Sequence, residues 1–256
     1  MGNIRKIIDR IWNEVGAQAG MLSGMSVLLI LIETIVYLMQ ADRSRFDLCI
    51  LDPFAIVSYT SGITLVPLGA LTGVFLLREE FQAMRVVRMK KMSYIWLDAC
   101  VKNVAAAAVI SAAGTLCCGI LGKITASAAY TWSGTSSIFF FLTGRTLPMV
   151  SYGKVCLMFF TGIFFAVWAS GMIVLLGYWL SGTYLWGMTA ILIFCVLGTL
   201  YHFPYDLYRG VNYYIVSETF TWKYQVVLPA AVVMCCVGTG FLVQRRDFLM
   251  KERQAE

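Results

Sequence analysis

Residues 78–91, REEFQAMRVVRMKK, interrupt a run of almost wholly apolar sequence. The stretch holds five of the chain's 20 lysines and arginines, together with the adjacent acids Glu79 and Glu80. On either side lie the apolar segments 55–77 and 96–121, each long enough to cross a bilayer as a helix, which takes about 20 residues. The stretch is therefore predicted to be a charged loop between two membrane helices.

The rest of the chain repeats this alternation of apolar and charged segments. Of its 256 residues, 59% are hydrophobic and 13% are charged, whereas about a quarter of the residues in soluble domains are charged. We therefore expect an all-α integral membrane protein, with residues 1–256 forming a single transmembrane domain. Six apolar segments are predicted to span the bilayer: 17–39, 55–77, 96–121, 155–179, 185–203 and 226–244.

The distribution of lysine and arginine predicts the orientation. With both termini in the cytoplasm, twelve basic residues fall on the inner side and seven on the outer side. Cytoplasmic loops of membrane proteins carry the excess of positive residues, so an N-in, C-in topology is favoured. The formal net charge of +6 then reflects membrane orientation, and no nucleic-acid partner is expected.

The N-terminal residues 3–15 predict a short amphipathic helix. Their apolar residues recur at the i, i+3, i+4, i+7 spacing of one helical face, and charged residues occupy the other face. Such a helix either lies in the cytoplasmic membrane interface or packs its apolar face on neighbouring helices. Gly16, Gly20 and Gly24 follow at the four-residue spacing that allows membrane helices to approach closely.

Glu33 is an acid inside the first apolar segment. Ionisable residues in membrane segments are candidates for function, so Glu33 is a candidate for the transport pathway. Its expected position, about six residues or ~9 Å of helix from the outer end, would let it reach an outer vestibule. The alternative is a structural hydrogen bond to a neighbouring helix.

The third segment opens with a second pair of charged residues, Asp98 and Lys102. Four residues apart, they share a helical face and are expected to pair at the mouth of the helix. A contact with another protein is the functional alternative. Of the eight cysteines, all but Cys49 lie in apolar runs without metal-ligand spacing, so we expect packing residues and no metal site.

Motifs of catalysis are absent from the sequence. There is no GxxxxGK[ST] phosphate loop, no HExxH and no GxSxG. We expect no enzyme activity and no cofactor on this chain. Intramembrane charge is also too sparse for a proton-driven carrier.

The 78–91 stretch and the helix after it resemble the cytoplasmic loop of ABC-2-type transporter permeases. In that family an acidic start leads into an aromatic residue and an arginine, then a small polar residue and a helix with a lysine near its start. Glu80, Phe81, Arg85, Ser93 and Lys102 fit this pattern. The family's Gly-Thr is replaced by Ala-Met at 83–84, and Tyr94 stands where an arginine is usual. The tail FLVQRRDFLMK, residues 241–251, resembles the end of the family's sequences.

The resemblance implies a membrane subunit of a transporter with a coupling helix at 78–92, seated on a separate ATPase that carries ATP and Mg. It implies an exporter of a peptide, lipid-like or drug-like amphiphile in a bacterial plasma membrane. A second copy of the chain, or a related permease, would complete the transporter. The residues expected to contact the ATPase are Glu79, Glu80, Phe81, Met84, Arg85 and Arg88.

Another class of function fits the same sequence. A six-span sensor or assembly scaffold would share the topology without transporting anything. In that case the basic loop would hold orientation through anionic lipid. Lipid binding accounts for the lysines of the stretch, whereas coupling also accounts for its acids and for Phe81.

Overall fold

The computed structural model describes residue 16 and residues 19–43, 48–80, 92–144, 146–147, 149–201 and 227–242. The secondary-structure elements in this part of the chain are all helices, and no strand occurs there. The all-α prediction is confirmed for these residues. The expected amphipathic helix at 3–15 lies outside them.

The described part of each of the six predicted apolar segments lies in a helix of its own. In chain order the helices are α2 (Ala19–Arg43), α3 (Asp52–Glu80), α5 (Met92–Thr125), the short α6 (Ile138–Thr143), α7 (Tyr152–Ser181), α8 (Leu185–Tyr201) and α9 (Leu228–Leu242). Among the described residues, three stretches are long and apolar enough to cross a membrane: Leu22–Met39, Ile95–Thr125 and Tyr152–Ser181. These helices make the protein compatible with a membrane, while the six-span count and the orientation stay predictions.

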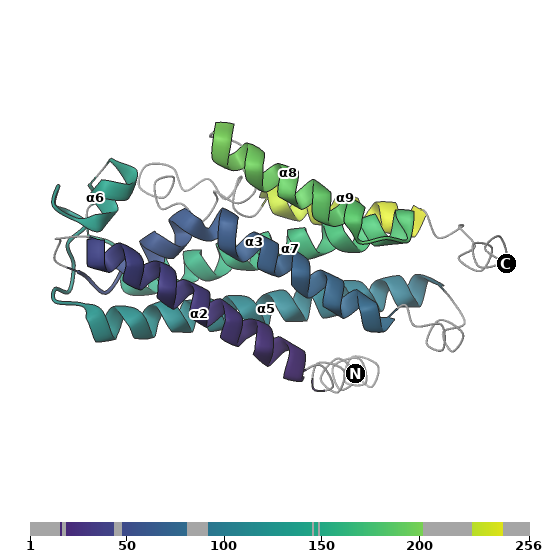
Figure 1. Ribbon diagram of the computed structural model, residues 1–256, viewed down its shortest axis with the longest axis horizontal. Helices are drawn as coiled ribbons and strands as arrows, with labels where there is room; N and C mark the ends of the chain where they lie inside the picture. Colours follow the sequence, from purple (N-terminus) through teal and green to yellow (C-terminus); the bar gives the residue numbers. More distant parts are fainter. Residues whose placement is uncertain are drawn as a thin grey trace.

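Helix α7 lies at the centre of the assembly. It packs most extensively on α3 and then on α5, and it also contacts α8 and α9 (Figure 1). Sixty-one per cent of its apolar stretch is buried, compared with 28% for α2, which packs on α5 and α3 from the side. A central helix that is apolar on all faces is expected where neighbours surround it completely.

Small residues allow α3 and α5 to approach α7 closely. A Cβ atom at Gly69 of α3 would lie 2.6 Å from the Ser170 hydroxyl, and one at Gly73 would lie 3.2 Å from the Cα atom of Gly171. A Cβ atom at Gly171 would in turn overlap the amide of Asn103 on α5. Contacts of this kind, with backbones close together, are the usual basis of helix packing in membranes.

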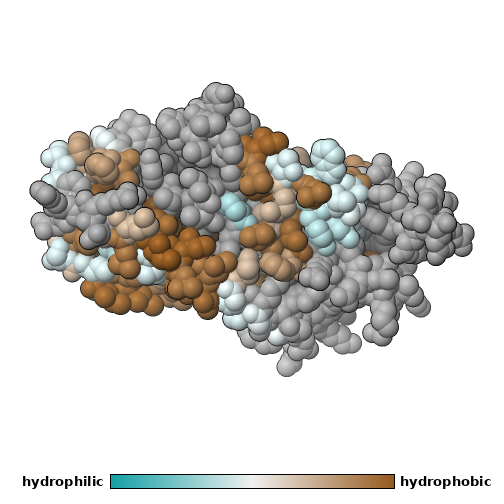
Figure 2. All heavy atoms as spheres, in the orientation of Figure 1, coloured by the Kyte–Doolittle hydropathy of each residue, from teal (hydrophilic) through white to brown (hydrophobic). Residues whose placement is uncertain are grey.

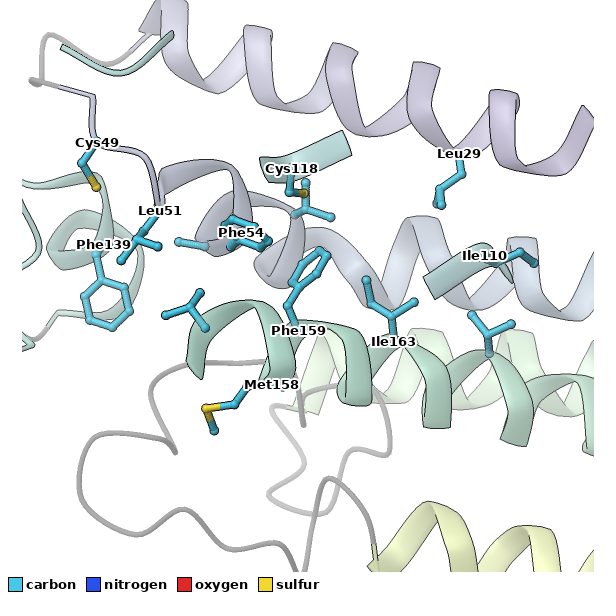
Figure 3. Packing of buried hydrophobic residues seen from close by; sticks show 14 of the residues in the cluster. Leu29, Cys49, Leu51, Phe54, Ile110, Cys118, Phe139, Met158, Phe159 and Ile163 are labelled. Atoms are coloured by element: carbon cyan, nitrogen blue, oxygen red, sulfur yellow. The ribbon is translucent and has the colours of Figure 1, made fainter. Parts of the chain in front are cut away.

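Large side chains fill the space between the helices around these contacts. Phe54 of α3 meets Phe159 of α7 edge to face, with ring centroids 5.1 Å apart, and Figure 3 shows these rings pointing toward one another. Near the other end of α7, Trp179 packs on Trp96 of α5, with ring centroids 5.2 Å apart. Both pairs are buried, and aromatic pairs add to stability beyond the area they bury.

The outward surface of the peripheral helix α2 is apolar. Val27, Leu31 and Ile35 are each more than half exposed, and they recur at four-residue spacing on one side of the helix. Hydrophobic side chains also cover the middle of the described surface in Figure 2. A contiguous exposed apolar face on a helix of this length fits contact with lipid or with another membrane helix.

Cys49 differs from its expected environment. The sequence places it in a polar loop, but the side chain is fully buried, beside an isolated backbone bridge to Ala128. The segment after α5 folds back over the start of α3, and Ser127 and Ala128 donate backbone hydrogen bonds to the carbonyl of Leu48. The loop is therefore covered by a part of the chain about 80 residues away in sequence.

Gly240 in α9 provides a test of the packing. A Cβ atom there would overlap the indole of Trp96, whereas Gly238, two residues earlier in α9, has nothing within 4 Å of that position. Gly240→Ala is expected to lower stability by about 1–3 kcal/mol through overpacking. Gly238→Ala should be neutral or slightly stabilising, since alanine favours helix over glycine. Thermal unfolding of the two variants in detergent compares them, and equal midpoints would show that α9 does not pack on Trp96.

Candidate functional site

The predicted coupling stretch begins inside a helix. Arg78, Glu79 and Glu80 are the last three residues of α3, and α5 begins at Met92. Residues 81–91 of the predicted coupling helix at 78–92 lie outside the described residues, so that helix stays a prediction. The other expected ATPase contacts, Phe81, Met84, Arg85 and Arg88, lie outside the described residues.

Glu33 is a residue of α2 whose side chain is buried against α5, and the residue is 1% exposed. The thiol of Cys118 on α5 donates a hydrogen bond to Oε2 of Glu33, with the sulfur 3.9 Å from the oxygen. The other carboxyl oxygen, Oε1, has no hydrogen-bond partner among the described residues. The acid therefore faces a neighbouring helix in a setting of thiols and apolar side chains.

Gly114 provides the space for this carboxyl group. A Cβ atom at Gly114 would lie 2.9 Å from Oε1 of Glu33 and 3.4 Å from a methyl group of Leu29. Figure 3 shows two neighbours of the acid, Leu29 and Cys118, within the same buried cluster. The absence of a side chain at Gly114 thus leaves room for the acid of α2 against α5.

Two further polar contacts continue along the same interface. Thr34 lies 3.9 Å from the sulfur of Cys117, and the Tyr37 hydroxyl pairs with that of Thr125. The sequence analysis treats Cys117 and Cys118 as packing residues only and does not single out Tyr37. Tyr37 follows Glu33 by four residues on the same face of α2, which is a usable signal, but the partner helix cannot be identified from it.

The apolar stretch of α2 ends at Met39, six residues beyond Glu33, which agrees with the expected ~9 Å of helix between the acid and the end of the span. The helix itself continues through polar residues to Arg43. A role for Glu33 in the transport pathway stays a prediction.

The ion pair predicted from spacing is present on α5. Lys102 Nζ lies 3.1 Å from Oδ2 of Asp98, and the two side chains are 4% and 13% exposed. The next residue, Asn103, donates from Nδ2 to the backbone carbonyl of Trp168 on α7 at 3.1 Å. The charges are paired along one helix, and the neighbouring amide joins that helix to α7.

A third polar centre lies at the end of the bundle where α3 begins. Asp52 is fully buried. Its Oδ1 accepts a hydrogen bond from Nε1 of Trp132 at 2.7 Å, and its Oδ2 accepts one from the backbone N–H of Cys49 at 2.6 Å. Burial raises the pKa of Asp52, and the hydrogen bonds from Cys49 and Trp132 oppose that shift.

This centre holds the loop before α3 to the segment around α6. Trp132 stacks on Phe139 of α6, with ring centroids 4.5 Å apart, and its carbonyl accepts a hydrogen bond from the N–H of Leu147. A cavity of about 300 Å³ opens beside it, mostly apolar and lined in part by Lys123, Tyr130 and Tyr152. Asp52 was not predicted as a site residue, because no local sequence pattern indicates that its partner is a tryptophan 80 residues away.

The described residues contain no cluster of His, Cys, Asp or Glu suited to a metal ion. Seven cysteines in this part of the chain are free thiols. No family model, no curated protein and no solved structure matches this chain. The resemblance to ABC-2-type permeases therefore stays a prediction that rests on the residues quoted above.

The buried ion pair makes a specific prediction about stability. Lys102→Met removes the ammonium group that lies 3.1 Å from the mostly buried carboxylate of Asp98. Breaking one side of a buried pair costs about 3–5 kcal/mol. The double variant Asp98→Leu, Lys102→Met should recover most of that loss, because no uncompensated charge is left. Denaturant or thermal unfolding of both variants measures this. A double variant less stable than Lys102→Met would contradict the pairing.

The Asp52 centre predicts energetic coupling across 80 residues. Asp52→Ala leaves the buried N–H groups of Cys49 and Trp132 without that acceptor, at a cost of about 1–3 kcal/mol for each unsatisfied group. Trp132→Phe removes one donor and keeps a ring against Phe139. In a double-mutant cycle the two changes should be non-additive by about 0.5–3 kcal/mol. Strictly additive effects on unfolding would show that the two side chains act independently.

Proposed function

We propose that this protein is the membrane subunit of an ABC-2-type transporter, driven by a separate ATPase. In this proposal it spans a bacterial plasma membrane six times with both termini inside, and it exports a peptide, lipid-like or drug-like amphiphile. Support comes from the resemblance of the 78–102 region and of the tail, and from the coincidence of all six apolar segments with helices.

The observation that carries the proposal is the connection between α3 and α5. These helices have 29 and 34 residues, and only residues 81–91 separate them. Both pack along the central helix α7. A partner that displaces this connection would act on two long helices joined to the core of the bundle. A connection of this kind suits the transfer of motion from an ATPase better than a loop between surface helices would.

Each residue type in the stretch has a place in such a contact. Phe81 and Met84 would supply the apolar anchor, and Glu79, Glu80, Arg85 and Arg88 the polar rim. An apolar centre with a charged rim is the usual anatomy of a protein interface. Lys90 and Lys91, nearest to α5, would face the lipid headgroups.

The transporter would contain two permease chains, since each chain offers one ATPase seat. Gly20 and Gly24 are exposed on α2, with nothing within 4 Å of the position of a Cβ atom. The apolar residues Val27, Leu31 and Ile35 of the same helix are also exposed. This surface would allow close contact with a second permease.

Phe81→Ala is the variant that tests the coupling contact. Truncating a buried aromatic anchor costs about 2 kcal/mol or more of binding, roughly a thirtyfold loss of affinity. We expect less ATPase to co-purify with the variant, or hydrolysis to continue without transport, while membrane insertion is normal. The matched control is Lys90→Gln with Lys91→Gln, which should change both measurements far less.

The reverse outcome would support the other class of function. If the lysine variant fails and Phe81→Ala behaves as the wild type, the stretch is an electrostatic membrane anchor. If no ATPase with a phosphate loop associates with the wild-type chain at all, the protein is better described as a membrane sensor or assembly scaffold.

A further inference from the structure

Glu33 and Asp98 are two membrane acids in opposite electrostatic settings. Asp98 has the ammonium group of Lys102 at 3.1 Å. Glu33 is more deeply buried and forms no ion pair among the described residues, and its Oε1 has no hydrogen-bond partner there. An ionised carboxylate without a compensating cation is strongly disfavoured in an apolar interior. The ion pair retains the charge of Asp98, and nothing described around Glu33 does the same for that acid.

Among the described residues, the groups that face Glu33 cannot supply the missing positive charge. From α5 come the thiols of Cys117 and Cys118, which are neutral or negative in every protonation state. Helix α3 also packs on α2, and its acid Asp52 lies near Tyr37, further along α2. Gly114 of α5 also lies against the carboxyl group, because a Cβ atom there would be 2.9 Å from Oε1 of Glu33.

We propose that Glu33 is a proton-binding site that holds α2 against α5. While the two helices are packed, the neutral carboxylic acid lies against Gly114 and accepts a hydrogen bond from the thiol of Cys118. When α2 moves away, the acid meets water or lipid headgroups and releases its proton. Helix α2 is the more exposed partner in this contact, so it is the element that can part from the bundle. The proposal rests on the α2–α5 contact alone and does not depend on an ATPase.

A hydrophobic carbodiimide distinguishes the neutral acid from the carboxylate. The carboxylic acid gives its proton to one nitrogen of dicyclohexylcarbodiimide, and the carboxyl oxygen bonds to the central carbon. The resulting O-acylisourea rearranges to a stable N-acylurea. Both steps conserve all atoms, so nothing leaves and no co-reactant is needed. Ile30, three residues before Glu33 on α2, is an exposed apolar residue and lies on the neighbouring part of the helix surface, so a lipid-soluble reagent can approach the interface from the lipid.

The experiment treats the full-length protein in lipid vesicles with this reagent at about pH 7 and quantifies adducts by peptide mass spectrometry. We expect the adduct at Glu33 to be at least about tenfold more abundant than any adduct at Asp98, a difference of about 1.4 kcal/mol. Asp98 is the matched control within the same chain, because it is a membrane acid whose partner keeps it ionised. Glu33→Gln should abolish the adduct.

Thermal unfolding of Glu33→Gln provides a second measurement. Glutamine imitates the neutral acid, so the variant should match the wild type at about pH 4, below the ordinary pKa of a glutamate, and exceed it at about pH 9, because the unfolded wild-type acid is stabilised by releasing its proton. The contrast between the two pH values should disappear in the variant.

Several results would overturn the proposal. Equal labelling of Glu33 and Asp98, or no adduct at Glu33, would show that the acid is not held neutral. Protection of Glu33 by sodium chloride but not by choline chloride at equal ionic strength would mean that the site binds a metal cation. A variant that is less stable than the wild type by the same amount at both pH values would show an ordinary packing role.

Discussion

Close approach of α3 and α5 to α7 is the constraint on which the rest of the structure depends. Gly69 and Gly73 bring α3 against Ser170 and Gly171, and Gly171 leaves room for the Asn103 amide. Lipid tails are as apolar as the side chains they would replace, so helices in a membrane gain little from burial alone and depend on such contacts. The aromatic pairs Phe54–Phe159 and Trp96–Trp179 then fill the space on either side.

Helix α5 contributes polar groups to two different helix interfaces. Toward α7 it presents Asn103, one residue from the paired charges of Asp98 and Lys102. Toward α2 it presents Gly114 and Cys118, which receive an acid without a described counter-charge. The first arrangement is satisfied within the bundle and suits a fixed contact. The second depends on protonation and suits a contact that can open, so α2 is the helix expected to move.

Local patterns in the sequence were sufficient for the helices and insufficient for their contacts. Apolar runs of about 20 residues marked six of the seven described helices, because a helix satisfies its own backbone in a bilayer, whereas the short α6 was not predicted. The Asp98–Lys102 pair followed from four-residue spacing. The hydrogen bond between Trp132 and Asp52 and the backbone bridge between Cys49 and Ala128 each join residues about 80 positions apart. No periodicity in the sequence predicts such pairs. For Glu33 the sequence predicted an unusual acid but not its neighbours on α5. The coupling residues from 81 onward stay predictions.

The central claim is that this chain works as one part of an ATP-driven membrane complex. The mass of the intact complex, measured by native mass spectrometry after isolation from the source membranes in mild detergent, tests it most directly. The account predicts a particle with two permease-type chains, at least one of them this protein, and two copies of an ATPase that carries a phosphate loop. A particle that contains this chain alone, or this chain with partners that lack a phosphate loop, would contradict the claim.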